Sequence, residues 1–222
     1  RVLPAGNCTA IPDAVSLDEA AMVEPLTLGL HAVRLGEVYP ATRAAVLGSG
    51  PIGLSVLLLA KVVAPLTVYV TDLIDERLRL ARQCGADWTG NAANGDAVAA
   101  IAEREPLGLD LVFECSGDPA AINQGIHLLA PGGRLVLVGI PPTKDVSFDI
   151  HAARPKELEF RNVRRQNGCM GPVVRLLAEG RIDVAPLVTH RFGLAQIRDA
   201  FELVDAYGDG VVKAMIDLSP GE

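Results

Sequence analysis

Short apolar runs rich in β-branched residues alternate with longer amphipathic stretches from about residue 43 of the chain onward. Four of these runs predict strands that are covered on both faces, because their apolar residues do not alternate with polar ones. They occupy residues 44–47, 67–70, 110–113 and 134–138. Residues 51–63 predict a helix with Pro51 in its first turn, and residues 75–84 predict a helix that ends at Gly85. This alternation predicts an α/β fold with a doubly wound parallel sheet.

The pattern changes toward the end of the chain. A further strand is predicted at residues 158–163, after Pro141, Pro142 and an irregular connection. The elements that follow do not extend the repeat, and they are predicted at residues 172–179 (helix), 187–192 (strand), 195–204 (helix) and 211–216 (strand). We therefore expect three segments, with the regular α/β domain at residues 25–167 and parts of a second domain at residues 1–24 and 168–222.

Composition and charge limit the classes of partner that the chain is expected to bind. Half of the 222 residues are hydrophobic and 21% are charged, which supplies a sizeable core. The net charge of −7 argues against a nucleic-acid or anionic membrane partner, since both require a basic surface. Ser55 and Lys61 interrupt the longest apolar stretch, so no membrane span is predicted. The expected partner is a small molecule.

The four cysteines are widely spaced. Cys8, Cys84, Cys115 and Cys169 form no Cys-x-x-Cys pair, so the sequence predicts neither a zinc knuckle nor a disulfide framework. Free thiols of this kind suit a cytoplasmic protein.

The sharpest motif is the glycine loop Gly48-Ser49-Gly50-Pro51-Ile52-Gly53, between a predicted strand and a predicted helix. Gly48 permits a tight turn, Gly50 leaves room for a pyrophosphate, and Gly53 allows the helix to pack closely on the strand. The amides of the helix N-terminus would then meet the negative charge of the ligand. In this context the loop indicates a dinucleotide-binding Rossmann fold, although a plain tight turn uses the same residues.

Asp72 ends the second predicted strand, about 20 residues beyond the last glycine, where Rossmann domains place a ribose carboxylate. A carboxylate there accepts hydrogen bonds from the adenosine ribose and repels the extra phosphate of NADP, so NAD is the expected cofactor. The competing interpretation is that Asp72 caps the helix that starts near Asp75.

Further candidates lie at the same predicted edge. Arg77 stands one turn into the next helix, where its guanidinium would lie across the adenine or fix the Asp72 carboxylate, unless it is an ordinary surface arginine. Ser116 follows the strand predicted at residues 110–113, and the stretch Val138-Gly139-Ile140 ends the strand predicted at residues 134–138. Small residues there let backbone groups approach the nicotinamide, although simple turns would use them as well.

Several stretches together resemble the zinc-dependent medium-chain dehydrogenases, and most closely their sorbitol, iditol and xylitol dehydrogenase branch. They are Ile11-Pro12-Asp13, Met22-Val23-Glu24-Pro25-Leu26, Gly29-Leu30-His31-Ala32, the glycine loop, Val138-Gly139-Ile140 and Pro186-Leu187-Val188-Thr189-His190-Arg191-Phe192. The resemblance covers nearly all of the chain. It implies oxidation of a secondary alcohol to a ketone, with hydride transfer to NAD and zinc as the Lewis acid.

The resemblance also implies roles for individual residues. Glu24 would stand beside the catalytic zinc, as a ligand or through its water, although without the resemblance it could equally be a carboxylate on a helix face. Val163 and Arg164 would meet the nicotinamide, and Arg165 would do so and also reach the substrate pocket. Gln166 stands where the polyol enzymes usually have a tyrosine, which leaves the particular polyol open.

The zinc ligands of that family are missing from this sequence. Relatives hold the metal mainly with a Cys and a Gly-His-Glu pair in an N-terminal catalytic domain of the GroES-like type, and no such constellation occurs here. One carboxylate cannot hold zinc against water. We therefore expect this chain to bind NAD without catalysis. Residues 1–24 and 168–222 are expected to be remnants of the catalytic domain, with exposed or poorly packed apolar faces. The chain is expected to assemble as a homodimer or homotetramer through the strands predicted at residues 134–138 and 158–163.

Other functions remain open at this point. A dinucleotide sensor without catalysis would carry the same glycine loop. A methyltransferase also has a glycine loop after its first strand, but it would not carry the dehydrogenase-like stretches. Quinone reductases share the half-fold but usually prefer NADP, and threonine dehydrogenases fit the pattern as well.

Overall fold

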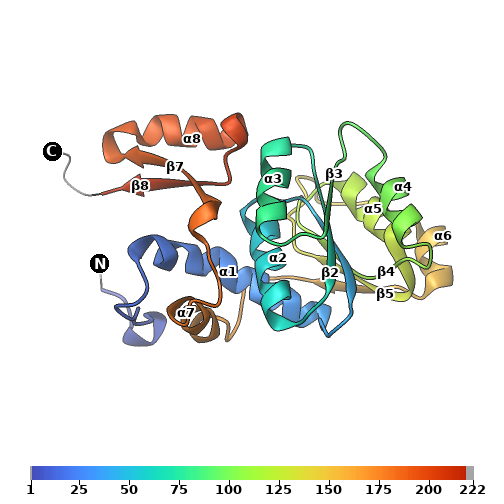
Figure 1. Cartoon of the computed structure of the whole chain (residues 1–222), viewed down its shortest axis with the longest axis horizontal. Coiled ribbons are helices and arrows are strands. Elements are labelled where there is room, and N and C mark those ends of the chain that lie inside the picture. Colours follow the sequence, from blue (N-terminus) through green and yellow to red (C-terminus); the bar gives the residue numbers. More distant parts are fainter. Residues whose placement is uncertain (1, 219–222) are drawn as a thin grey trace.

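The structure is a computed structural model that describes residues 2–218 (Figure 1). The strands are β1 (Arg43–Leu47), β2 (Thr67–Asp72), β3 (Trp88–Asn91), β4 (Leu109–Glu114), β5 (Leu129–Leu137), β6 (Glu159–Asn162), β7 (Val188–Gly193) and β8 (Lys213–Asp217). The helices are α1 (Leu17–Gly36), α2 (Pro51–Val63), α3 (Asp75–Gln83), α4 (Ala97–Arg104), α5 (Pro119–Leu128), α6 (Ile150–Ala153), α7 (Met170–Ala178) and α8 (Ile197–Asp205). Short 3-10 turns lie at Ala5–Asn7, Arg154–Lys156, Ala185–Leu187, Leu194–Gln196 and Gly208–Gly210.

Six parallel strands form the main sheet in the order β3-β2-β1-β4-β5-β6. Crossovers run outward in both directions from β1, so the order reverses between β1 and β4. In an open α/β sheet such a reversal opens a crevice at the carboxyl ends of the strands, where ligands bind. The expected doubly wound sheet is confirmed.

Both faces of the sheet are covered, as the apolar runs predict. Along β1 the side chains alternate, so that Ala44 and Val46 face one core and Ala45 and Leu47 face the other. The first core includes buried residues of α1, α2, α3 and α7, and the second includes those of α4, α5 and α6. The uninterrupted apolar character of the strands therefore follows from burial on two sides.

Helix α1 is the longest helix and begins with a capping box. The Ser16 hydroxyl accepts a hydrogen bond from the backbone N–H of Glu19, whose carboxylate accepts one from the Ser16 backbone N–H. The helix continues through residues 24 and 25, where we expected a segment boundary, and includes Pro25. Its buried face packs on α2, and Gly29 lies against the backbone of Ser55.

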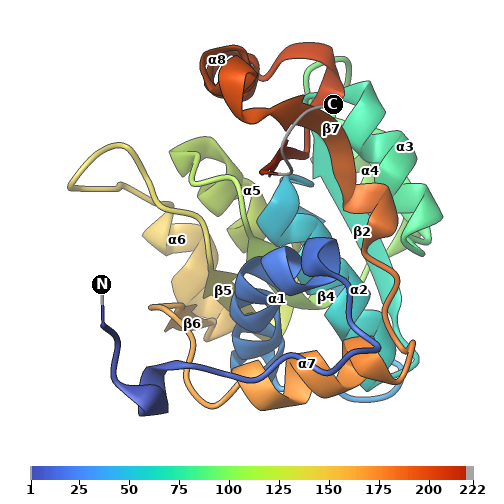
Figure 2. The same ribbon diagram turned by 90° about the vertical axis from the view of Figure 1, so that its left-hand side faces the viewer.

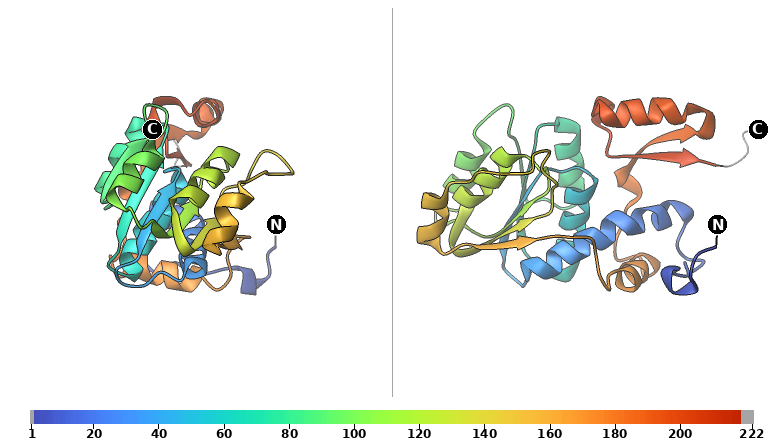
Figure 3. Two further views of the ribbon diagram at one scale, coloured as in Figure 1. Left: turned by 90° about the vertical axis from the view of Figure 1, so that its right-hand side faces the viewer. Right: turned by 180° about the vertical axis from the view of Figure 1, so that it is seen from behind.

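The C-terminal elements differ in how they pack. Helix α7 lies beside α1 (Figure 2), and Val173, Val174 and Leu177 are buried in the main core, so the expected poor packing is wrong for this helix. Strands β7 and β8 pair in parallel and lie with α8 to one side of the main sheet (Figure 3). Phe201 on α8 is 71% exposed, so an apolar side chain of this helix is exposed, as we expect for the C-terminal segment. No helix within residues 2–218 combines the length and apolar composition needed to cross a membrane.

The contact between α1 and α2 gives a stability prediction. A Cβ atom at Gly29 would lie 2.9 Å from the carbonyl carbon and 3.0 Å from the carbonyl oxygen of Ser55, and backbone cannot move aside easily. Overpacking of this kind outweighs the better helix propensity of alanine, so Gly29→Ala should lower the free energy of unfolding by about 1–2 kcal/mol.

Gly171→Ala in α7 is the matched control for this measurement. A Cβ atom there would meet nothing within 4 Å, so the variant should be unchanged or more stable by up to about 1 kcal/mol. Chemical denaturation measures both variants. Equal stability of Gly29→Ala and the unmodified protein would contradict the close approach of the two helices.

Candidate functional site

The glycine loop joins β1 to α2 by a turn that other residues could not make. Gly48 has φ +94° and donates its N–H to the carbonyl of Thr71 at 2.8 Å. A Cβ atom at Gly53 would lie 1.9 Å from the carbonyl oxygen of Gly48, so only glycine allows the helix to begin this close to the strand. Pro51 occupies the first turn of α2, and Ile52 packs against the core from a half-buried position.

The middle glycine of the loop leaves space above it. Apart from the adjacent residues of the loop, a Cβ atom at Gly50, the N-cap of α2, would have within residues 2–218 one neighbour closer than 4 Å, Arg77 Nη1 at 3.7 Å. A side chain would fill this space, and its absence leaves a cradle over the first turn of a 13-residue helix. The unpaired amides and the dipole of a helix N-terminus favour an anion. The loop therefore fits a phosphate group.

Asp72 lies at the end of β2 beside this loop and accepts four hydrogen bonds. Its Oδ2 accepts from the backbone N–H of Ser49 at 2.6 Å and from the Ser49 hydroxyl at 3.0 Å. Its Oδ1 accepts from the backbone N–H groups of Leu73 at 2.8 Å and Ile74 at 3.0 Å. Asp72 thus ties the glycine loop to the turn that enters α3, as well as partly capping that turn.

Arg77 is not a surface arginine, and it does not bind Asp72 in this structure. Its side chain is buried and donates to the carbonyl of Val211, from Nε at 3.1 Å and from Nη2 at 2.6 Å. The guanidinium also lies 5.3 Å from the ring centroid of Tyr207. The expected contact with the Asp72 carboxylate is wrong here because these two C-terminal groups hold the guanidinium, although Nη1 stays beside Gly50.

A second carboxylate organises the ends of β4 and β5. Glu114 is completely buried, and its Oε1 accepts from the Ser116 N–H at 2.7 Å, the Ser116 hydroxyl at 2.6 Å and the Gly117 N–H at 2.8 Å. Its Oε2 has no hydrogen-bond partner within the described part of the chain. Burial raises the pKa of Glu114, while the hydrogen bonds from Ser116 and Gly117 act in the opposite direction.

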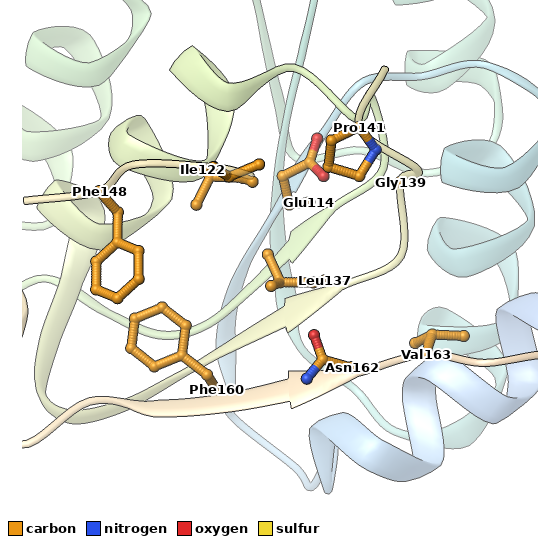
Figure 4. A pocket seen from close by; sticks show the side chains of 10 residues that line it. Glu114, Ile122, Leu137, Gly139, Pro141, Phe148, Phe160, Asn162 and Val163 are labelled. Carbon is orange, nitrogen blue, oxygen red and sulfur yellow. The ribbon is translucent and has the colours of Figure 1, made fainter. Parts of the chain in front are cut away.

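The ends of β4, β5 and β6 surround a cavity of about 250 Å³ (Figure 4). Glu114 and Asn162 supply polar groups to its wall, and the rings of Phe148 and Phe160 lie 5.2 Å apart on its apolar side. Gly139 and Val163, both expected near the nicotinamide, also line it. The structure therefore brings the ends of β5 and β6 together at one cavity.

The remaining candidates of this edge differ in exposure. Val138 is buried, whereas the neighbouring Ile140 is 89% exposed. Arg164 and Arg165 are exposed after β6, Arg165 with φ +61°, and their side chains make no hydrogen bond or ion pair with residues 2–218.

Glu24 lies exposed on α1. Between residues 2 and 218, no three His, Cys, Asp or Glu side chains lie close enough together to hold a metal ion. Zinc in proteins takes three or more protein ligands, so Glu24 and its surroundings do not complete a zinc site.

Comparison with known proteins identifies the family of this chain. Residues 51–179, more than half of the chain, match the family described as zinc-binding dehydrogenase. The chain belongs to this family. Sorbitol dehydrogenase of Gallus gallus is 38% identical over 219 residues, which cover 97% of this chain and 61% of that protein. The likeness to sorbitol dehydrogenases supports the polyol branch, and the chain spans about three fifths of the length of its relatives.

Solved members of the dehydrogenases share the fold. A short chain alcohol dehydrogenase from Escherichia coli CFT073, solved with its cofactor NADH, has a TM-score of 0.89 and 28% identity over 97% of this chain and 64% of its own. A zinc-binding dehydrogenase from Sinorhizobium meliloti 1021, solved with NADP, has a TM-score of 0.86 and 29% identity over 93% of this chain and 61% of its own. Family membership therefore leaves the choice of dinucleotide to the residues of the site.

Two residues of this edge are missing from the sequence-based prediction. Ser49 stands inside the glycine motif, but its contact with Asp72 depends on the spacing of β1 and β2, which the motif does not contain. Glu114 follows the apolar residues 111–113 at the end of β4, a pattern that indicates a hydrogen-bonded acid but not which loop it binds.

Burial of Glu114 gives a pH-dependent prediction. Because its pKa is raised in the folded state, the folded protein binds more protons than the unfolded chain from about pH 4.5 upward, and this residue lowers stability as the pH rises. Glu114→Gln keeps the Oε1 acceptor but removes the titration. The stability of the variant relative to the unmodified protein should therefore increase from pH 4 toward pH 8.

Glu159→Gln serves as the control with the opposite sign. The hydrogen bonds from Arg134 and Arg161 lower the pKa of Glu159, so its contribution is present above its unfolded pKa and is lost as the pH falls. Solvent screening keeps that effect small. Denaturant unfolding at several pH values measures both, and a pH-independent difference for Glu114→Gln would contradict the raised pKa.

Proposed function

We propose that this chain is the NAD-binding part of a zinc-dependent alcohol or polyol dehydrogenase, which oxidises a secondary alcohol to a ketone and transfers hydride to NAD. The observation that carries the proposal is the Asp72 carboxylate at the rim of an open glycine loop. Membership of the zinc-binding dehydrogenase family supports the reaction class.

The residues of the loop fit the dinucleotide. The pyrophosphate would lie over Gly48, Gly50 and Gly53 at the N-terminus of α2, facing the first backbone N–H groups after Pro51, and Arg77 Nη1 beside Gly50 would add positive charge. When bound, NAD supplies the hydride acceptor. Ile52 would contact the cofactor within the glycine loop. The nicotinamide half of the cofactor would contact Ser116, Val138-Gly139-Ile140 and Val163-Arg164-Arg165.

NAD is proposed over NADP because of the charge at the rim. A carboxylate beside the adenosine ribose accepts hydrogen bonds from its hydroxyl groups, whereas it repels the phosphate that NADP carries there. Within residues 2–218, no basic side chain binds Asp72 and neutralises this repulsion. Arg77 donates to the carbonyl of Val211 instead.

The oxidation of the alcohol at zinc would require a GroES-like catalytic domain in addition to the residues of this chain. Glu24 would stand near the metal, directly or through water, and Arg165 would reach the alcohol. Residues 1–24 and 168–222, of which residue 1 and residues 219–222 lie outside the described part, would belong with a GroES-like catalytic domain, and residues 25–167 would form the cofactor domain. The exposed apolar face of α8 supports this division.

The proposed assembly is a homodimer or homotetramer in the cytoplasm. Strand β6 lies at the edge of the sheet and leaves one side open for pairing with a second copy. The four cysteines are unpaired thiols, as a reducing compartment would keep them.

Replacing Asp72 tests the proposed cofactor. Asp72→Ala removes the charge-assisted acceptors for the ribose, so the dissociation constant for NAD should rise roughly 10- to 100-fold, while the preference for NAD over NADP should shrink. Asp75→Ala, a nearby change of the same charge, is the control and should leave both affinities unchanged. Titration calorimetry measures these constants, and unchanged NAD affinity in Asp72→Ala would refute the assignment.

Activity of the complete protein tests the proposed reaction. Polyols, simple secondary alcohols and threonine should be screened for NADH formation by absorbance. We expect activity with at least one polyol or secondary alcohol, loss of activity with a chelator, and recovery with zinc. NAD binding without NADH formation from any substrate would favour the sensor over the dehydrogenase.

A further inference from the structure

The Asp72 carboxylate has no acceptor site left for a ligand in this structure. A carboxylate offers about four lone-pair sites, and Asp72 uses four. Ser49 occupies Oδ2 with its backbone N–H and its hydroxyl, and the N–H groups of Leu73 and Ile74 occupy Oδ1. A ribose hydroxyl that donates to Asp72 must therefore displace one of these donors. This point rests on the proposed function, in which NAD binds at the glycine loop.

Three of the four donors are backbone groups that the fold holds in place. Ser49 lies between Gly48, whose N–H donates a hydrogen bond to the carbonyl of Thr71, and Gly50, the N-cap of α2. The N–H groups of Leu73 and Ile74 belong to the turn that enters α3, where Ile74 is the N-cap. Displacing any of them requires the backbone to move.

The Ser49 hydroxyl is the donor that a ligand can displace. It is the single side-chain donor of the four, and rotation about one bond removes it from Oδ2. At 3.0 Å its hydrogen bond is longer than the 2.6 Å bond from the Ser49 backbone N–H to the same oxygen. Ser49 is completely buried, so a displaced hydroxyl does not gain hydrogen bonds to bulk water.

We propose that Ser49 is a specificity-determining residue that weakens NAD binding, because its hydroxyl occupies the acceptor site on Asp72 that the adenosine ribose needs. Binding exchanges the Ser49 O–H for a ribose O–H at Oδ2. The protein therefore holds NAD less tightly than the same loop would with alanine at position 49. The backbone N–H of residue 49 continues to hold the carboxylate in place.

Removal of the Ser49 hydroxyl is expected to strengthen NAD binding. Ser49→Ala frees one acceptor site on Asp72, and the net value of one hydrogen bond corresponds to an NAD dissociation constant about three- to tenfold lower. The gain should be smaller for NADP, which carries a phosphate in place of one ribose hydroxyl. Titration calorimetry with NAD and NADP on the purified protein measures both.

A double-mutant cycle separates this effect from general changes in the loop. Ser49→Ala in the Asp72→Ala background should leave NAD affinity unchanged, because the acceptor is gone. Ser55→Ala is the matched control: Ser55 is also completely buried, but its hydroxyl donates to the carbonyl of Pro51 at 2.7 Å, so NAD affinity should not rise. Cysteine is a weaker donor of similar size, so Ser49→Cys should give a smaller increase in NAD affinity than Ser49→Ala. This variant tests the proposal if Ser49→Ala does not fold.

Each outcome bears on the proposal. Tighter NAD binding that depends on Asp72 supports it. Weaker or unchanged binding by Ser49→Ala shows that the hydroxyl positions the carboxylate, or plays no part, and overturns it. Tighter binding in both backgrounds overturns it as well. Absence of NAD binding by the unmodified protein would instead overturn the proposed function, and this inference with it.

Discussion

The carboxyl edge of the sheet depends on the hydrogen bonds that Asp72 makes across the gap between two strand ends. The residue belongs to β2, yet one of its oxygens holds Ser49 in the loop that follows β1. Its other oxygen holds the turn that enters α3. The Asp72 side chain thus sets the position of the glycine loop relative to α3. The close contact between Gly53 and Gly48 fixes α2 beneath the loop.

Glu114 performs a similar task on the other side of β1, but under different electrostatic conditions. The two loops abut, since a Cβ atom at Gly48 would lie 3.0 Å from the Ser116 nitrogen that Glu114 holds. Asp72 is partly exposed and has donors on both oxygens. Glu114 is buried, and within residues 2–218 one of its oxygens has no hydrogen-bond partner, so a charge on it is costly. In the proposed function, Asp72 at the rim of the glycine loop is therefore the carboxylate that would discriminate against a ligand phosphate.

The sequence predicts well those elements whose signals are local. Helix α2 has the predicted bounds because Pro51 and the glycine loop mark its start, and the apolar strands follow from their burial on two faces. Strand β3 is missed because Trp88–Asn91 is short and contains Gly90, which weakens its strand pattern. Helix α1 is not assigned because Pro25 interrupts a stretch that reads as helix only with its packing partners.

Contacts between distant segments are beyond any local pattern, and Arg77 illustrates the consequence. Its position after Asp72 is visible in the sequence, but Val211 and Tyr207 lie more than 100 residues away. Within residues 2–218 this buried guanidinium has no carboxylate partner, and it stands beside Gly50. A buried cation without a counter-ion is costly, and an anion on the glycine loop would offset that cost. In the proposed function, the cofactor phosphate would therefore stabilise the same side chain that holds the C-terminal segment against α3.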